Sequence, residues 1–381
     1  MQIIPIASGK GGVGKSLVAA NLAVALAQSG KRVVLADLDL GGSNLHLILG
    51  LRAVPQGIGT FFSSSSFPFE SLIIDTETPN LRFIPGDNEI PGMANLKQSQ
   101  KKNLIRHLLN LSDTDFLILD LGAGTNSNTL DFFLLSNHGI VVTTPTLTAT
   151  VNAYFFIKNA IFRLLDTSFE KTSWARLELD RRLASGSGVQ KLYVSKFLDE
   201  VKKNDQESYA AYKKATRNFQ PRFLLNMLDD PKDVDKVSRV RRSCREYLDV
   251  DLEHLGVIYR DELQDVALAS RLPIILYKPQ AVLSQAIYRI ADKMIQFERA
   301  DTGPLDLTEL EETYQTATLE AEIDFSAKLA YLEELLDTGA LSTGDLVEAV
   351  RSQQFEITQL KKENTLLKSK IVQAIQSGYK F

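Results

Sequence analysis

The stretch GKGGVGKS at positions 9–16 has the residue types and spacing of a phosphate-binding loop. It fits the pattern G-x-x-x-x-G-K-[ST], in which glycines let backbone N–H groups converge on phosphate oxygens. We expect Lys15 to bridge the β- and γ-phosphates of a nucleotide and Ser16 to offer its hydroxyl to Mg²⁺. A glycine-rich turn with chance lysines is the alternative, but the strand pattern before the loop and the helix pattern after it argue against it. The residues expected to bind nucleotide here are Gly9, Lys10, Gly11, Gly12, Val13, Gly14, Lys15, Ser16 and Leu17.

Three aspartates follow apolar, strand-like stretches. Asp37 and Asp39 lie in LADLDLGGSN, and Asp120 lies in FLILDLGAG. Because ligands of open α/β sheets bind at the carboxyl ends of the strands, we expect these carboxylates to face the phosphates. Asp37 and Asp120, with Ser16, are the expected Mg²⁺ ligands, and Asp39 is expected to orient the attacking water. Each aspartate alone has a plainer alternative as a helix cap or a solvated charge, but three in a phosphate-loop protein favour the metal and water roles.

The elements that must position these residues alternate between strand and helix. Short apolar runs separated by amphipathic stretches predict βα units, and hence an α/β fold with a mostly parallel twisted sheet and helices on both faces. The run FLILDL is apolar enough for a strand buried on both faces. The expected strands are 2–7, 32–37, 81–85, 115–121, 139–145, 222–228 and 254–259, and the expected helices include 16–29, 94–111, 127–136 and 148–165.

Two further regions depart from this alternation. Residues 166–220 are polar and helical in composition, with ASGSG at 184–188 as a joint. They predict an inserted helical subdomain or lid, or else a plain surface elaboration. Residues 301–345 hold twelve acidic residues and one basic residue, whereas 346–381 hold three acidic and six basic. We therefore expect a first domain at 1–298, an acidic helical linker region at 299–345 and a separate helix at 346–381.

The last helix carries a seam with a period of 3.5 residues, which is typical of a coiled coil. With branched residues at a, leucine at d and Asn364 at a, a parallel two-stranded coil is predicted. Glu356 and Glu363 at g would face Lys361 and Lys368 at e of the partner helix. The alternatives are a helix folded back on the first domain and a weak membrane-surface helix near the end of the chain. The seam consists of Leu346, Val350, Gln353, Ile357, Leu360, Asn364, Leu367, Ile371 and Ala374.

Composition narrows the class of protein. The chain has 381 residues, a net charge of −4 and a single cysteine, Cys244. These values exclude an intramolecular disulfide framework and argue against a protein devoted to binding polyanions. We see neither a leader peptide nor an apolar stretch that could span a bilayer, so we expect a cytoplasmic protein. Arginines cluster at 176–182 and 239–245; non-specific DNA binding is one interpretation, and solvated or carboxylate-paired arginines are the favoured one.

The motifs KGGVGKS, DLDLGGSNLHLILG and DLGAG together resemble the MinD/ParA group of ATPases, whose loop is called the deviant Walker A. The resemblance covers residues 1–298, interrupted by 166–220, and GIGTFF, LRFIPGD and RFLLNML are most similar to the FlhG (FleN/YlxH) branch. It implies a P-loop NTPase fold of the SIMIBI type that uses ATP, ADP and Mg²⁺. It also implies a homodimer closed over two nucleotides, with Lys10 reaching the partner's phosphates.

By the same resemblance, the catalytic residues are Lys10, Lys15 and Asp39. Asn226 would read the adenine edge and Asp261 would flank the base, although Tyr259 stands where the family usually has proline. The implied function is a slow, partner-stimulated ATPase switch that controls the position or number of a cellular machine such as flagella, with a place at the membrane periphery or cell pole. The alternative is a nucleotide-binding scaffold with little hydrolysis that acts through its C-terminal helices.

Overall fold

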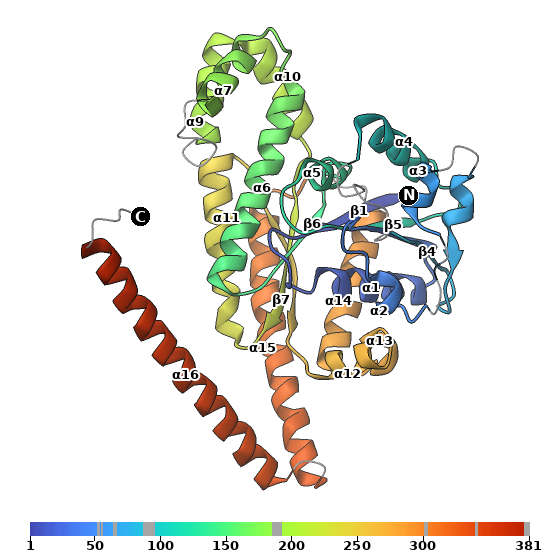
Figure 1. Ribbon diagram of the computed structural model, residues 1–381, viewed down its shortest axis with the longest axis vertical. Coiled ribbons are helices and arrows are strands. Elements are labelled where there is room, and N and C mark those ends of the chain that lie inside the picture. Colours follow the sequence, from blue (N-terminus) through green and yellow to red (C-terminus); the bar gives the residue numbers. More distant parts are fainter. Residues whose placement is uncertain are drawn as a thin grey trace. The chain divides into compact units, whose positions relative to one another are not determined.

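An eight-stranded sheet in the order β3-β4-β2-β5-β1-β6-β7-β8 forms the centre of the fold (Figure 1). The computed structural model describes residues 1–51, 54, 56–63, 67–86, 96–184, 193–300, 304–339 and 342–376. The strand pairs are parallel except for β3 with β4, which confirms the predicted fold class. The strands are β1 (Gln2–Ala7), β2 (Val33–Leu38), β3 (Ile74–Asp75), β4 (Leu81–Ile84), β5 (Phe116–Leu121), β6 (Ile140–Thr143), β7 (Arg222–Leu228) and β8 (Glu253–Tyr259).

Helices cover both faces of the sheet, and each face has its own apolar core. One core is closed by α1 (Lys15–Gln28), α12 (Leu263–Ala269), α13 (Ile274–Tyr277) and α14 (Val282–Ala300). The other is closed by α4 (Gln98–Leu109), α5 (Ser127–Phe133), α6 (Leu147–Ser168) and α11 (Asp235–Leu248). The short elements α2 (Leu45–Ile48), α3 (Ile58–Ser63), η1 (Phe69–Leu72) and η2 (Pro231–Val234) complete this arrangement.

The register of the central strands brings the sequence-predicted site residues to one edge. In the parallel pair β2 and β5, Asp37 lies opposite Asp120, and Ile6 near the end of β1 lies opposite Asp120 on the other side. The phosphate loop follows β1 directly. Every residue of β2 and β5 is buried, which is the expected result for central parallel strands covered on both faces.

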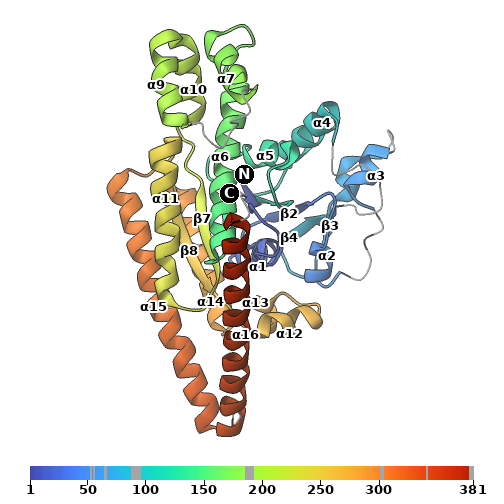
Figure 2. The ribbon, with the colours of Figure 1, turned by 60° about the vertical axis from the view of Figure 1, so that its left-hand side comes forward.

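The predicted insertion consists of α7 (Trp174–Ala184), α9 (Val194–Asn204) and α10 (Gln206–Thr216), which lie at one end of α6 and α11 (Figure 2). Its apolar side chains, including Phe169, Leu179, Phe197 and Tyr212, are buried in the same core cluster as residues of α6 and α11. The insertion therefore packs on α6 and α11 through an apolar core that it shares with them. Residues 185–188 of the predicted joint lie outside the described residues.

The acidic region begins as a helix that covers an edge of the sheet. In α15 (Leu307–Asp337), one face of Leu310, Tyr314, Ala317 and Ala321 is buried in the core. The chain divides into a unit at Met1–Phe325 and a unit at Ser326–Phe381, so the first unit continues past the boundary expected at 298. It does so because this face of α15 covers β8, a strand with no further neighbour in the sheet.

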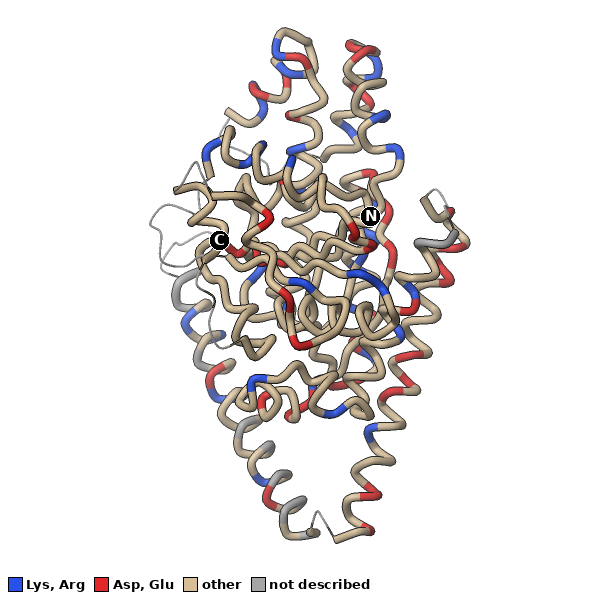
Figure 3. Tube along the Cα trace, turned by 90° about the vertical axis from the view of Figure 1, so that its right-hand side faces the viewer, with Lys and Arg blue, Asp and Glu red and all other residues tan. Residues whose placement is uncertain are grey.

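The second unit contains the end of α15 and α16 (Thr343–Gln376), a single helix of 34 residues. Acidic residues recur along α15, whereas the described part of α16 holds both acidic and basic residues (Figure 3). This distribution agrees with the change of composition seen in the sequence at residues 345–346.

Candidate active site

The phosphate loop takes the backbone shape that its glycines allow. Gly12 and Gly14 have φ angles of 78° and 81°, in the left-handed region that favours glycine. Gly14 is also the cap of α1, so the free N–H groups at the start of that helix point into the loop. At Gly9, an added Cβ would lie 2.1 Å from the carbonyl oxygen of Asn152, so only glycine fits against the backbone of α6. The loop is thus built to receive an anion.

Lys15 lies buried at the centre of a cluster of oxygen atoms. Its Nζ donates to Asp120 Oδ1 at 2.5 Å and to Ser16 Oγ at 3.1 Å. Asp39 Oδ2 is 4.0 Å from the same Nζ. Burial raises the pKa of Asp120, and the charge and hydrogen bond of Lys15 oppose that rise. Carboxylate and hydroxyl oxygens therefore already surround a cation here, and this donor set fits Mg²⁺.

Asp37 supports the loop that follows β2. It is fully buried, and its carboxylate accepts hydrogen bonds from the Ser43 hydroxyl at 2.7 Å and the Leu45 N–H at 3.2 Å. The Asp39 N–H donates to its other oxygen at 3.2 Å. Burial, followed by the negative charge of Asp120, raises the pKa of Asp37 to about 6. These contacts leave Asp37 better placed to act on a metal through water than directly.

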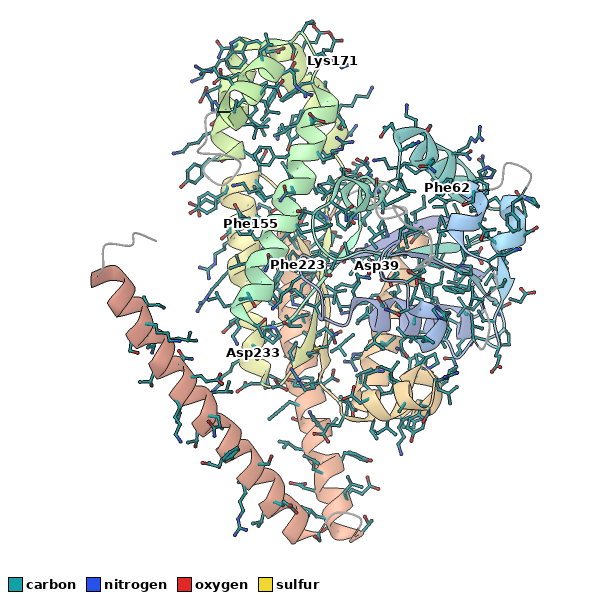
Figure 4. The ribbon with its side chains drawn as sticks, viewed as in Figure 1. Asp39, Phe62, Phe155, Lys171, Phe223 and Asp233 are labelled. Atoms are coloured by element: carbon teal, nitrogen blue, oxygen red, sulfur yellow. The ribbon has the colours of Figure 1, made fainter. Side chains whose placement is uncertain are left out.

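Asp39 is the more accessible of the two β2 aspartates. Its side chain is 32% exposed, and an added Cβ at Gly122 would lie only 3.1 Å from its Oδ1. Glycine at position 122 therefore leaves room for the carboxylate. Figure 4 shows Asp39 beside the sheet, well away from Lys171 on the segment that joins α6 to α7. A carboxylate with access to solvent at this place can hold a water molecule.

Lys10 does not join the Lys15 cluster. It is exposed, and its Nζ donates to Thr148 Oγ1 at 3.4 Å near the start of α6. Next to it on α6, Leu147 is 78% exposed. The two lysines of one short loop therefore point to different surroundings, one buried among carboxylates and the other at the rim.

A cavity of about 360 Å³ at the ends of β7 and β8 is also lined by residues of α1, α12 and α14. Its lining includes Leu17, Asn226 and Asp261, which the sequence assigned to the base and the loop. This volume is within the roughly 300–1,000 Å³ typical of ligand pockets. Asn226 also has a contact that the sequence did not reveal, since its Nδ2 donates to the Val13 carbonyl at 2.9 Å. It thereby fastens the phosphate loop to β7.

Tyr259 is a residue of this cavity that sequence reasoning left without a role. Its hydroxyl donates to the Ala321 carbonyl of α15 at 2.8 Å, and its ring lies 6.1 Å from that of Phe325. Burial raises the pKa of Tyr259. The signal in the sequence was the departure from the proline that the family usually has at this position. The structure shows a physical reason for the tyrosine, because its hydroxyl group makes a hydrogen bond to α15 that proline could not make.

The arginine clusters have carboxylate partners. Arg241 pairs with Glu311 at 2.7 Å, and Arg245 lies 3.3 Å from Asp251. In α7, Arg176, Arg181 and Arg182 pair with Asp166, Asp180, Glu178 and Glu200. These pairs favour the carboxylate-paired interpretation over DNA binding. None of the helices in the described part of the chain combines the length and apolarity needed to cross a bilayer.

Comparison with known proteins extends these observations. A ParA family model, described as "NUBPL iron-transfer P-loop NTPase", matches residues 1–160. The antiactivator FleN of Pseudomonas aeruginosa is 31% identical over 296 residues, which are 77% of this chain and 86% of FleN. The flagellum site-determining protein YlxH of Helicobacter pylori is 34% identical over 161 residues, or 41% of this chain and 53% of YlxH. The matches to septum site-determining MinD proteins likewise span about half the length of those relatives.

A solved structure supports the fold. The cell division ATPase MinD of Pyrococcus furiosus superposes with a TM-score of 0.51 and 21% sequence identity, covering 78% of this chain and 99% of that one. At this identity the similarity establishes the arrangement of the sheet and its helices, and the residues of the site must be judged by their own geometry.

Proposed function

Because this chain belongs to the ParA/MinD family of P-loop NTPases, we propose that it is an ATP-dependent switch. ATP closes two copies face to face, and slow hydrolysis to ADP and phosphate opens them again. The observation that supports this proposal is that the two lysines of the phosphate loop lie in different surroundings. Lys15 is buried against the carboxylate of Asp120, whereas Lys10 is exposed at the rim, where a second copy can be reached.

Lys15 changes its partner when nucleotide binds. In the structure its ammonium group is held by Asp120 at 2.5 Å. A phosphate chain carries more negative charge than one carboxylate, and the loop N–H groups and the start of α1 add their own attraction for it. Phosphate therefore displaces Asp120 from Lys15. Lys15 then stabilises the negative charge that develops during hydrolysis.

The oxygen donors around Lys15 suit the remaining roles. Ser16, Asp120 and, through water, Asp37 would hold Mg²⁺, which neutralises charge on the β- and γ-phosphate oxygens when it is bound. Asp39 is partly exposed and would orient the attacking water. Gly122 leaves the space beside Asp39 in which that water has to fit.

Lys10 serves the site of the opposite copy. Two like charges in one short loop are costly unless an anion neutralises both of them. Lys10 finds only a hydroxyl in its own chain, that of Thr148, among the described residues. Inserted next to the partner's phosphates, it would act as a cation supplied in trans, as an arginine finger does.

The cavity at the ends of β7 and β8 would receive the base. An asparagine amide has two N–H donors and one acceptor oxygen, so Asn226 can hold Val13 and still face a purine edge. Asp261 lines the same cavity and would flank the base. An asparagine amide can pair with either purine, so adenine is proposed over guanine from the resemblance to the MinD/ParA ATPases.

The cellular role follows from the relatives. YlxH is named a flagellum site-determining protein, and the MinD relatives are named septum site-determining proteins. We propose that this switch likewise controls the position or number of a cellular machine, with flagella or another polar assembly as its target. A protein partner would bind the closed form and stimulate hydrolysis.

Lysine substitutions test the switch. We expect Lys10→Ala to bind ATP but to lose ATP-dependent closure and hydrolysis, whereas Lys15→Ala should lose nucleotide binding itself. Lys171→Ala, which removes an exposed lysine far from the site (Figure 4), is the matched control and should behave as wild type. Phosphate release and nucleotide titration measure these outcomes. Hydrolysis by Lys10→Ala at the wild-type rate would show that no trans lysine is needed.

One observation favours a second function, a nucleotide-binding scaffold. The helix α16 is long and carries large exposed apolar side chains, among them Leu360 and Leu367, so it can bind partners whatever the rate of hydrolysis. Phosphate release that is abolished by Asp39→Ala supports the switch. Closure by ATP with no turnover, in wild type and Asp39→Ala alike, supports the scaffold.

A further inference from the structure

Within the described part of the second unit, α16 presents a row of apolar side chains that are about half exposed. Val350, Ile357, Leu360, Leu367 and Ile371 are between 45% and 58% exposed. In an isolated soluble chain, side chains of this kind in a continuous row mark an interaction surface. What covers the row depends on its width, its register and the charges along its borders.

The width of the row is that of a two-helix seam. These residues are separated by steps of seven, three, seven and four, which gives the 3.5-residue period of a left-handed coiled coil. A helix that packs on a globular core needs a wider apolar face, about three positions in seven. The described positions 358, 361, 362, 365 and 368, which border or oppose the seam, are polar and exposed. Two exposed apolar residues outside the row, Val347 and Phe355, precede this stretch. From Ile357 to Ile371, a seam this narrow fits one partner helix better than the surface of a folded domain.

The register specifies a parallel pair. With Leu360 and Leu367 at d, the a positions are occupied by Ile357, Asn364 and Ile371. Branched residues at a combined with leucine at d favour two strands, and one asparagine at a pairs with its own copy only when the helices are parallel and in register. Asn364 is therefore the residue that fixes the alignment, at some cost in stability.

The charges along the borders complement a second copy. In a parallel pair, a residue at g faces the residue five positions later, at e of the other helix. Glu356 would face Lys361, and Glu363 would face Lys368, in both directions across the seam. A helix that lies on a membrane would instead carry cations along both borders of a broad apolar face. Glutamates at the border disfavour an anionic lipid surface.

We propose that α16 pairs in parallel with α16 of a second copy of this chain, in the absence of nucleotide. The pair would hold two ATPase units at an effective concentration in the millimolar range. ATP would then close units that are already joined, rather than recruit a second chain from solution. A parallel coil and a face-to-face ATPase pair both have two-fold symmetry, so one axis serves both contacts. This pairing does not require that the chain hydrolyse ATP.

Light scattering of the nucleotide-free full chain at micromolar concentration tests the pairing. We expect a dimer, and we expect the double variant Leu360→Asp/Leu367→Asp to be a monomer that still binds ATP. The matched control is Thr358→Asp/Thr365→Asp, which places the same charges at exposed positions beside the seam and should stay dimeric. A wild-type monomer overturns the proposal, as does a dimer that survives both double variants.

A cysteine cross-link tests the direction of the helices. The chain has one cysteine, Cys244, which is buried, so the background is low. In a parallel pair, Leu360→Cys places two thiols in the same layer of the seam, and mild oxidation should give a disulfide-linked dimer. Thr358→Cys, outside the seam, should not cross-link. Failure of Leu360→Cys to cross-link, or cross-linking of both variants to the same extent, contradicts a parallel seam.

Discussion

The imidazole of His254 should make the anchoring of α15 sensitive to acid. His254 lies on β8, 2% exposed, with its ring edge-on to that of Tyr314 in α15 at 5.1 Å. Neither ring nitrogen has a hydrogen-bond partner among the described residues. Burial, followed by the positive charge of Lys293, lowers the pKa of His254 to about 3. The ring is therefore neutral in the folded protein at pH 7 and at pH 5.

The direction of the effect follows from the two pKa values. In the unfolded chain the pKa of histidine is about 6.5, so below that pH the unfolded state binds a proton that the folded state excludes. The folded-state stability provided by a neutral His254 is thus complete above pH 6.5 and declines as the pH falls toward 3. At pH 5 the difference of about 1.5 pH units from the unfolded pKa corresponds to about 2 kcal/mol of unfolding free energy.

Urea unfolding at pH 7 and pH 5 measures this contribution. We expect wild type to lose about 2 kcal/mol more between these pH values than His254→Leu does, because leucine has a similar size and does not titrate. His46→Leu is the control, since His46 is only partly buried and should leave the acid sensitivity of wild type almost intact. Equal losses in wild type and His254→Leu would refute the assignment of a buried neutral imidazole.

Three further substitutions test the contacts of the site. Tyr259→Phe removes one buried hydrogen bond to α15, so the unfolding free energy should fall by about 1 kcal/mol while ATP affinity is retained; urea unfolding and nucleotide titration measure both. Asn226→Ala releases the phosphate loop, and a loss of about 1.4 kcal/mol would weaken ATP binding about tenfold, as a titration would show. Gly122→Ala places a Cβ 3.1 Å from Asp39 Oδ1, so phosphate release should slow while ATP still binds. An unchanged unfolding free energy, ATP affinity or rate of phosphate release, respectively, would contradict the role given to that contact.

The central strands were predictable because local sequence determines them. β2 and β5 are continuous apolar runs with an aspartate one residue before the end of the strand. In a parallel sheet, that pattern predicts carboxylates at the edge where ligands bind. The two-residue strand β3 and the polar helix α11 were not predicted. β3 is short and half-exposed, and α11 buries only Val237, Val240, Cys244 and Leu248 among many charged residues. In both elements the local hydrophobic pattern is weak, and contacts with the rest of the fold determine the secondary structure.

The contacts of single side chains were less predictable than the elements that carry them. The sequence marked Asn226 for the base, but its bond to Val13 joins residues 213 positions apart. Lys15 was expected on phosphate, and in the structure its charge is balanced by Asp120. A buried lysine needs a counter-charge in each state of the protein, and sequence motifs describe only the state with ligand.

The boundary expected at residue 298 was based on the net charge of the following region, and net charge does not reveal a buried apolar helix face within it. The region after it is strongly acidic, which indicates a solvated linker, yet Leu310, Tyr314, Ala317 and Ala321 follow each other at steps of four, three and four. That spacing marks one face of a helix, and its two alanines let α15 approach the sheet edge closely. Three of these acidic side chains, those of Glu311, Asp324 and Glu320, pair with arginine or lysine on neighbouring helices, as Glu320 does with Lys293 at 2.7 Å. Because the same face accepts the hydrogen bond of Tyr259, an acidic segment that looks like a linker is a structural part of the first unit.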